Sequence, residues 1–156
     1  MTPESLMREA IAVARRGIAA GQTPFGCCVA LGGEIISSTH NTVHADTDIT
    51  AHAEVNALRA ACREAGSVLL EGGIAATTCE PCPMCMAALH WARVEVVYFG
   101  ATIADAKAAG FNELQLPAQH LLAQGGSPTR LEGPLLQEEC RALFAEWNAR
   151  EDRRSY

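Results

Sequence analysis

The chain has 156 residues, of which 49% are hydrophobic and 19% are charged, and its net charge is −6. This length and composition are typical of one globular domain with its own core, and the chain is too short for two comfortable domains. No apolar run is long enough to span a bilayer, and the acidic balance argues against nucleic acid as a partner.

Hydrophobic periodicity and turn residues predict ten elements along the chain. In chain order they are helix 3–20, strand 25–31, strand 34–39, helix 50–65, strand 73–78, helix 83–92, strand 94–99, helix 117–124, strand 129–132 and helix 135–149. Gly32-Gly33 is a hairpin signal between the first two strands, and Gly66 ends the second helix. The run from Val94 to Phe99 is typical of a strand buried on both faces.

This order of elements predicts an α/β fold in three layers, α/β/α, with a central mixed five-stranded sheet. We expect residues 1–156 to form a single domain, with a charged tail over 150–156 that leaves the core. There are seven cysteines, an odd number, and the N-terminus lacks the basic-then-apolar order of a signal peptide. We therefore expect a cytoplasmic protein with reduced thiols and a metal rather than disulfides.

Two short stretches carry the chemistry, and together they read H-x-E and P-C-x-x-C. Cys82 and Cys85 share one face of the first turn after a proline, where unpaired backbone N–H groups favour thiolates. With His52 as third ligand they predict a site for zinc (Zn²⁺) whose fourth position is open to water. Glu54, two residues after His52, is the predicted catalytic group that transfers protons there.

Two other metal or thiol readings compete with this catalytic one. A redox C-x-x-C pair needs neither His52 nor Glu54, and a structural zinc needs a fourth Cys or His at motif spacing, which the sequence lacks. The joint pattern is the signature of zinc-dependent nucleobase deaminases. We therefore favour a catalytic site.

On these residues the chain resembles the cytidine/deoxycytidylate deaminase-like superfamily, and within it the bacterial guanine deaminases. The matching stretches are PFG (24–26), TAHAEV (50–55), TCEPCPMC (78–85), WAR (91–93), AAGF (108–111) and the final Tyr156. The resemblance implies the cytidine deaminase-like fold and a zinc-dependent hydrolase acting on a free purine base. The implied reaction converts guanine to xanthine and releases ammonia.

The same resemblance implies which residues bind the purine. Asn41 would hydrogen-bond the base, the Ala53 region would form the pocket floor, and Phe25 and Trp91 would flank the ring. Glu113 would accept hydrogen bonds from the N1–H and 2-amino groups of the base. The residue before Glu113 is asparagine, where the guanine deaminases often carry aspartate.

The resemblance also implies a domain-swapped homodimer, in which Tyr156 closes the partner's active site. From composition alone Tyr156 reads as a frayed terminus, Glu113 as a solvated carboxylate, Phe25 and Trp91 as core residues, and Asn41 as a turn residue. The nearest alternative function is another deaminase, of tRNA adenosine, cytosine, guanosine or an aminotriazine. The alternative of another class is a non-catalytic, zinc-stabilised binding module.

Overall fold

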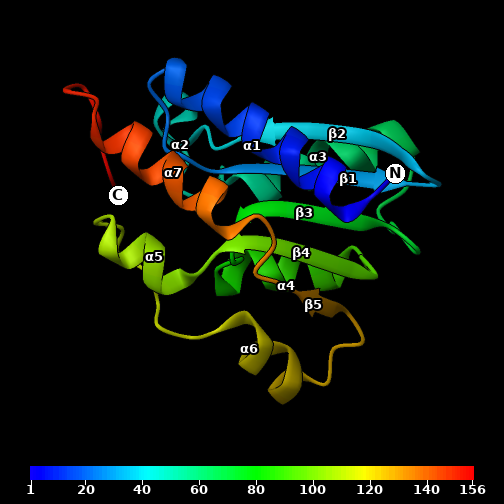
Figure 1. Ribbon diagram of the computed structural model, residues 1–156. Helices are drawn as coiled ribbons and strands as arrows, with labels where there is room; N and C mark the ends of the chain where they lie inside the picture. The colour runs from blue at the N-terminus through cyan, green and yellow to red at the C-terminus, as the bar shows by residue number, and fades with distance from the viewer.

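A mixed five-stranded sheet forms the middle layer of the molecule (Figure 1). The computed structural model describes residues 1–156, and its strands are β1 Gly26–Leu31, β2 Glu34–His40, β3 Ile74–Cys79, β4 Val96–Ala101 and β5 Arg130–Glu132. The helices are α1 Pro3–Ala19, α2 Val43–Asp46, α3 Ala53–Ala65, α4 Pro83–Trp91, α5 Ile103–Ala108, α6 Ala118–Gly125 and α7 Gln137–Asn148. The strands lie in the order β2-β1-β3-β4-β5.

The sheet combines an antiparallel half and a parallel half. β1 pairs antiparallel with β2 and with β3, while β4 pairs parallel with β3 and with β5. The hairpin between β1 and β2 is the predicted Gly32-Gly33 turn, and both glycines have positive φ (60° and 88°), as a two-residue turn of this kind requires. The parallel step from β3 to β4 passes through α4, so α4 begins just beyond the end of β3.

Helices cover both faces of the sheet, which confirms the predicted three-layer fold (Figure 1). α1 and α7 pack against one face, in a core that includes Leu6, Ile11, Ala14, Leu143 and Trp147. α3, α4 and α6 pack against the other face, in a core that includes Ala57, Leu58, Met86, Leu89 and Leu122. None of the helices has both the length and the apolar character needed to cross a membrane.

The start of α3 and two additional short helices differ from the sequence prediction. The helix expected from Thr50 begins at Ala53, because Asp48 accepts hydrogen bonds from the backbone N–H and the hydroxyl of Thr50 (2.8 and 2.7 Å) and closes a separate turn. The short helices α2 and α5 were not expected. α5 has only six residues and depends on a capping box between Thr102 and Asp105, so it lacks the periodic length that a sequence pattern needs.

The carboxyl ends of β3 and β4 define the edge of the sheet at which the functional residues gather. Because these strands are parallel, the segments that follow Cys79 and Ala101 start side by side, and the N–H of Glu80 donates to the carbonyl oxygen of Ala101 (2.8 Å). The start of α3 lies at the same edge, where the hydroxyl of Thr39 donates to the carbonyl oxygen of Ala53 (2.9 Å).

Candidate active site

Two helix N-termini converge on one point and bring His52, Cys82 and Cys85 together there. His52 is the N-cap of α3, Cys82 is the N-cap of α4, and Cys85 lies in the first turn of α4. The N-caps Thr2 and Thr102 accept a hydrogen bond from their own helices, but the side chains of His52 and Cys82 do not. These side chains are therefore available to a ligand, and the dipoles of both helices favour negative charge beside it.

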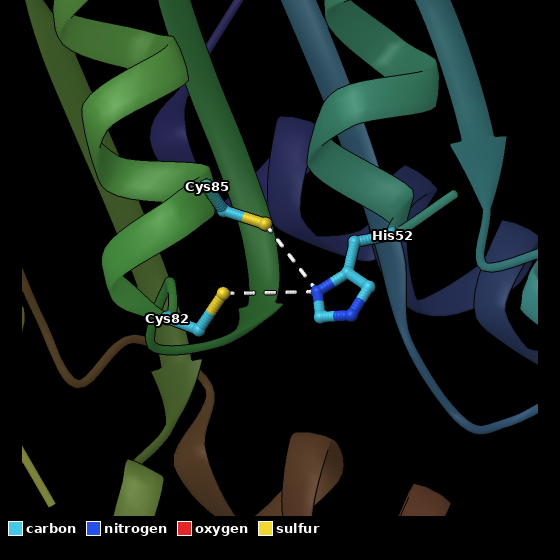
Figure 2. Close-up of side chains that lie close together, drawn as sticks. All are labelled: His52, Cys82 and Cys85. Atoms are coloured by element: carbon cyan, nitrogen blue, oxygen red, sulfur yellow. Dashed lines mark hydrogen bonds between the residues drawn. The ribbon is translucent and has the colours of Figure 1, made fainter. Parts of the chain in front are cut away.

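The three side chains have the spacing of a tetrahedral metal site (Figure 2). Nδ1 of His52 lies 3.7 Å from Sγ of Cys82 and 3.5 Å from Sγ of Cys85, and the three ligand atoms all lie within 4.8 Å of one another. With Zn–S bonds of about 2.3 Å and Zn–N bonds of about 2.0 to 2.1 Å, tetrahedral angles place N and S about 3.6 Å apart. The cluster therefore fits zinc, and three protein ligands would leave its fourth position open.

The two thiols of the cluster differ in protonation. The hydrogen bond from the Cys85 thiol, together with His52, lowers the pKa of Cys82 to about 4, although burial opposes this shift. The same hydrogen bond and burial raise the pKa of Cys85 well above its ordinary value. One thiolate therefore exists before any metal binds, and the proton on Cys85 must leave when both sulfurs bind the metal.

The Glu54 carboxyl group is buried beside the cluster. Glu54 is the second residue of α3, only 7% of it is exposed, and Thr77 of β3 donates a 2.9 Å hydrogen bond to its Oε1. Burial, reinforced by the negative charge of Cys82, raises the pKa of Glu54 above that of an ordinary carboxyl group. A raised pKa makes the carboxylate of Glu54 a better proton acceptor than an ordinary carboxylate, which suits a group that must accept and release protons.

A cavity of about 320 Å³ lies over the cluster, and a small space of about 20 Å³ continues from it toward Glu54. Four residues line both spaces, namely His52, Cys82, Glu113 and Tyr156. Burial, and then the charge of Cys82, raise the pKa of Glu113 to about 7. Its backbone carbonyl accepts a hydrogen bond from within its own loop, but its carboxylate has no partner in the protein. The cavity therefore presents one unpartnered carboxylate to a ligand.

Asn41, Phe25 and Tyr156 enclose the inner space. Asn41 is fully buried, and its Nδ2 donates a 2.6 Å hydrogen bond to the hydroxyl of Tyr156. The ring of Tyr156 lies 5.6 Å from the ring of His52, measured between centroids. Phe25 packs edge-on against Phe111, with the ring centroids 4.8 Å apart. The structure thus brings these three predicted residues to the cluster.

The C-terminal tail leaves the core only in part. Residues 151–155 are exposed as predicted, but Tyr156 returns and is partly buried against the site of its own chain. His44 contributes to this return, because its Nε2 lies 2.9 Å from the carbonyl oxygen of Arg154. The burial of an aromatic ring explains why the end of a charged segment folds back.

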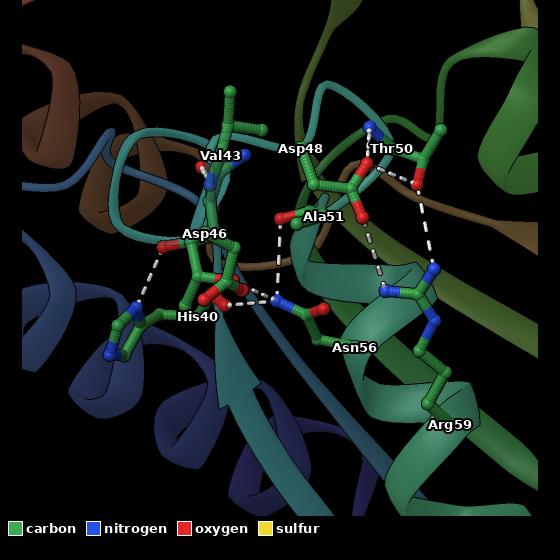
Figure 3. Close-up of polar contacts among 10 residues, drawn as sticks. His40, Val43, Asp46, Asp48, Thr50, Ala51, Asn56 and Arg59 are labelled. Carbon is green, nitrogen blue, oxygen red and sulfur yellow. Dashed lines mark hydrogen bonds and ion pairs between the residues drawn. The ribbon is translucent and has the colours of Figure 1, made fainter.

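Asn56 of α3 holds the loop between β2 and α3 in place through hydrogen bonds (Figure 3). Its side-chain N–H groups face the carbonyl oxygen of His40 (3.1 Å), the hydroxyl of Thr42 (2.8 Å) and the carbonyl oxygen of Ala51 (3.3 Å). His40 directly precedes Asn41 of the pocket, and Ala51 directly precedes His52 of the cluster. One amide therefore holds both ends of the loop that delivers these two side chains.

Two residues expected to bind substrate lie elsewhere. Ala53 is fully buried between His52 and Glu54 and lines neither space of the cavity. Trp91 ends α4, is 78% exposed and lines a separate hollow of the surface. At about 1.5 Å per residue, about 13.5 Å of helix separates Trp91 from Cys82, so Trp91 does not flank this cavity within the chain.

Thr77 and Glu80 contribute to the site but were not predicted as site residues. Thr77 directly precedes the matching TCEPCPMC stretch, and its hydroxyl holds Glu54. Glu80 lies inside that stretch, and its carboxylate accepts hydrogen bonds from the backbone N–H groups of Ile103 (3.2 Å) and Ala118 (2.9 Å). Their position beside the motif was the only signal, because the partners of both are more than 20 residues away in the sequence.

Comparisons with known proteins agree with this geometry. The family model for the cytidine and deoxycytidylate deaminase zinc-binding region matches residues 1–101. The guanine deaminase of Bacillus subtilis (strain 168) is 42% identical over 114 residues, which cover 72% of this chain and 73% of that protein. The tRNA-specific adenosine deaminase of the same strain is 41% identical over 102 residues, which cover 65% of this chain and 63% of that protein.

Among solved structures, the protein NE0047 in complex with 2,6-diaminopurine has a TM-score of 0.88 and 29% identity, over 96% of this chain and 83% of that chain. The cytidine deaminase-like fold is therefore confirmed. Guanine and tRNA deaminases match to a similar extent, so family membership alone leaves the substrate open. The matched residues 1–101 include His52, Cys82 and Cys85. The chain belongs to the cytidine and deoxycytidylate deaminase family of zinc-binding proteins.

Proposed function

We propose that the protein is a zinc-dependent hydrolase that deaminates a free purine base and converts guanine to xanthine and ammonia. The observation that carries this proposal is the unpartnered Glu113 carboxylate in the cavity above the His52 and Cys82 side chains. Guanine presents two adjacent donors, N1–H and the 2-amino group, and a carboxylate accepts such a pair with its two oxygens. Adenine and cytosine lack this pair of donors.

In the proposed mechanism Glu54 transfers the protons. A zinc ion held by the cluster would lower the pKa of a water molecule to about 7. Glu54 takes a proton from the attacking water and delivers it to N3 of guanine, next to the reacting C2. It then takes the second proton, from the hydroxyl now bonded to C2, and delivers it to the amino group, which leaves as ammonia while the C2 carbonyl of xanthine forms. Thr77 holds Oε1 of Glu54, which leaves Oε2 for this transfer. A backbone N–H near Cys82 would donate to the oxygen that adds to C2.

The remaining pocket residues are proposed to hold the ring. Asn41 would hydrogen-bond the purine, and Phe25 would pack against it from the inner end of the cavity. The Asn41 amide is bonded to the Tyr156 hydroxyl in this structure, so the base would share or replace that hydrogen bond. Tyr156 would then close the cavity behind the bound base.

The shape and charge of the cavity favour a free base over tRNA. Its volume of about 320 Å³ lies at the lower end of the range for small-molecule pockets. No lysine or arginine lines either space, and the rim carries the exposed apolar side chains Ile49, Met84 and Leu114. Binding to a phosphate backbone depends on cationic side chains, and these linings supply none.

A non-catalytic, zinc-stabilised module remains the alternative of another class. Such a module holds its metal with four protein ligands. The cluster contains three, and all seven cysteines of the chain are free. Three ligands favour a catalytic site, and free thiols suit a reducing compartment such as the cytoplasm.

We also propose that residues 1–156 form one deaminase domain that assembles as a domain-swapped homodimer. Residues 151–155 are exposed, so the tail is held only weakly to its own chain. Exchange of identical tails between two chains therefore costs little free energy. Tyr156 would then make the same contacts in the partner's site. Mixing inactive Glu54→Ala and Tyr156→Ala proteins is expected to restore about a quarter of native activity, because one site in four is complete. If no activity returns, Tyr156 acts only within its own chain.

Ammonia release by the purified zinc protein tests the proposed reaction. The substrates compared are guanine, guanosine, adenine, cytosine, an aminotriazine and a tRNA with the target adenosine. We expect guanine to be preferred by about 100-fold or more in kcat/KM, because a site built for two donors rejects bases that lack them. Glu113→Gln is expected to reduce turnover of guanine in particular. Release from the tRNA with none from guanine would overturn the proposal.

A further inference from the structure

Glu80 connects the metal-binding loop to the segment that carries Glu113. Its two carboxylate oxygens each accept one backbone hydrogen bond, Oε2 from Ile103 (3.2 Å) and Oε1 from Ala118 (2.9 Å). Ile103 is the first residue of α5, and Ala118 is the first residue of α6. One side chain, two residues before Cys82, therefore ties together the starts of two helices.

The N–H groups of Ile103 and Ala118 lie at the two ends of the segment that forms one wall of the cavity. Between them lie residues 104–117, and this segment supplies four residues that line the cavity, namely Phe111, Asn112, Glu113 and Leu114. Residues 111–117 form neither helix nor strand, and the Glu113 carboxylate has no partner in the protein. The position of that carboxylate therefore depends strongly on where the two ends of the segment are held.

We propose that Glu80 is a positioning residue that sets substrate selectivity by fixing the Glu113 carboxylate relative to the metal cluster. The inference rests on the proposed function, in which Glu113 reads the base. Glu80 borders the inner space, but both of its oxygens are bonded to the backbone, so it acts through the loop. A carboxylate is required, because a glutamine has one acceptor oxygen and its NH₂ group would face the second N–H.

The test compares the zinc-loaded wild type with Glu80→Gln. In the variant we expect faster amide hydrogen exchange over residues 103–118, with unchanged exchange over 53–65 and unchanged zinc content. KM for guanine is expected to rise by about 10- to 100-fold while kcat changes by less than about threefold. Glu80→Asp keeps the charge but is too short to reach both N–H groups, so it should show the same changes and serves if Glu80→Gln does not fold.

Glu95→Gln is the matched control, because it removes a carboxylate that makes only an exposed contact with Arg130 (3.2 Å). It should match the wild type in hydrogen exchange, zinc content and KM. A double-mutant cycle with Glu113→Gln then separates positioning from a general structural effect. If Glu80 acts through Glu113, adding Glu80→Gln to Glu113→Gln changes KM by less than about twofold.

Unchanged exchange over residues 103–118 would overturn the proposal, as would independent, multiplicative effects of Glu80→Gln and Glu113→Gln on KM. A wild-type protein that releases no ammonia from guanine would refute the proposed function, and the selectivity role would fall with it. In that case the exchange comparison still decides whether Glu80 holds the loop. The two failures are therefore distinguishable.

Discussion

His52 and Cys82 are both N-cap residues, and their side chains meet with Nδ1 of His52 3.7 Å from Sγ of Cys82. An N-cap side chain usually binds the N–H groups of its own helix, whereas these two side chains turn toward each other. The N–H groups left unpaired at both helix starts favour the thiolate form of Cys82. The fold thus builds its metal site from two helix starts that lie 30 residues apart in the sequence.

Replacement of Cys85 by serine should remove the metal. A serine hydroxyl stays protonated at neutral pH and is a poor zinc ligand, so we expect zinc affinity to fall by at least about 100-fold. Cys62→Ser is the control, because Cys62 lies in the last turns of α3 and outside the cluster. Metal content after dialysis measures the effect. A Cys85→Ser protein that keeps one zinc per chain would contradict the ligand assignment.

Zinc binding to the metal-free protein should release protons at pH 7. The pKa of Cys82 is about 4, so this group is already a thiolate, whereas the pKa of Cys85 is raised well above its ordinary value and this thiol is protonated. Binding of both sulfurs therefore displaces at least the Cys85 proton. Calorimetric titration in buffers of different ionisation enthalpy counts the protons. A binding enthalpy that is the same in every buffer would disagree with this protonation pattern.

Glu54→Gln should separate metal binding from turnover. The variant keeps the size of the side chain but removes the group that accepts and donates protons. We expect stoichiometric zinc and a loss in kcat of about 10²- to 10⁴-fold or more. Zinc content and ammonia release from guanine, measured on one preparation, check the expected metal binding and the expected loss in kcat. Near-native kcat in this variant would remove Glu54 from the mechanism.

Thr77→Val should move the acid limb of the kcat/KM pH profile to higher pH. The Thr77 hydroxyl bonds Oε1 of Glu54 at 2.9 Å and stabilises the carboxylate form, so its loss raises the pKa of Glu54 further. The acid limb reports the base of the free enzyme. Thr78→Val is the control, because the Thr78 hydroxyl accepts its hydrogen bond from Gly26 instead (3.1 Å). An unshifted limb in Thr77→Val would show that the hydrogen bond does not tune Glu54.

Glu113→Gln should change how the stability of the metal-free protein depends on pH. Burial raises the pKa of Glu113 from an ordinary 4.5 to about 7, so the folded state binds this proton more tightly than the unfolded state. The stabilisation from the protonated carboxyl is complete below pH 4.5 and is lost as pH rises through 7. The difference in unfolding free energy between wild type and variant should therefore fall over this range in urea titrations. A pH-independent difference would contradict the raised pKa.

The proximity of His52, Cys82 and Cys85 could be predicted because each half of the cluster has a local sequence pattern. Cys82 and Cys85 are neighbours in one helical turn, and His52 and Glu54 lie two residues apart at the start of another helix. The joint H-x-E and P-C-x-x-C pattern is what links these two halves. The order of helices and strands predicted the layers for the same reason, since each element carries its own periodicity. The start of α3 was wrong by three residues, because the side chain of Asp48 closes a turn that delays the helix.

The rest of the site depends on contacts between distant segments. Thr77 reaches Glu54 through the packing of β3 against α3, and Glu80 reaches α5 and α6 across the parallel strands. No local pattern encodes these pairs. Trp91 is the opposite case, in which a local match predicted a contact that the fold does not make. Its place in the matching WAR stretch suggested that it lines the pocket, but it lies at the end of α4 that is far from Cys82.

X-ray absorption at the zinc edge tests the central claim most directly, namely that zinc has three protein ligands and an open position beside Glu54. We expect two sulfur ligands at about 2.3 Å, one imidazole nitrogen at about 2.0 to 2.1 Å and one light atom from solvent. This fourth ligand should change when a purine analogue is added. A third sulfur or a second imidazole, unaffected by the analogue, would contradict the claim.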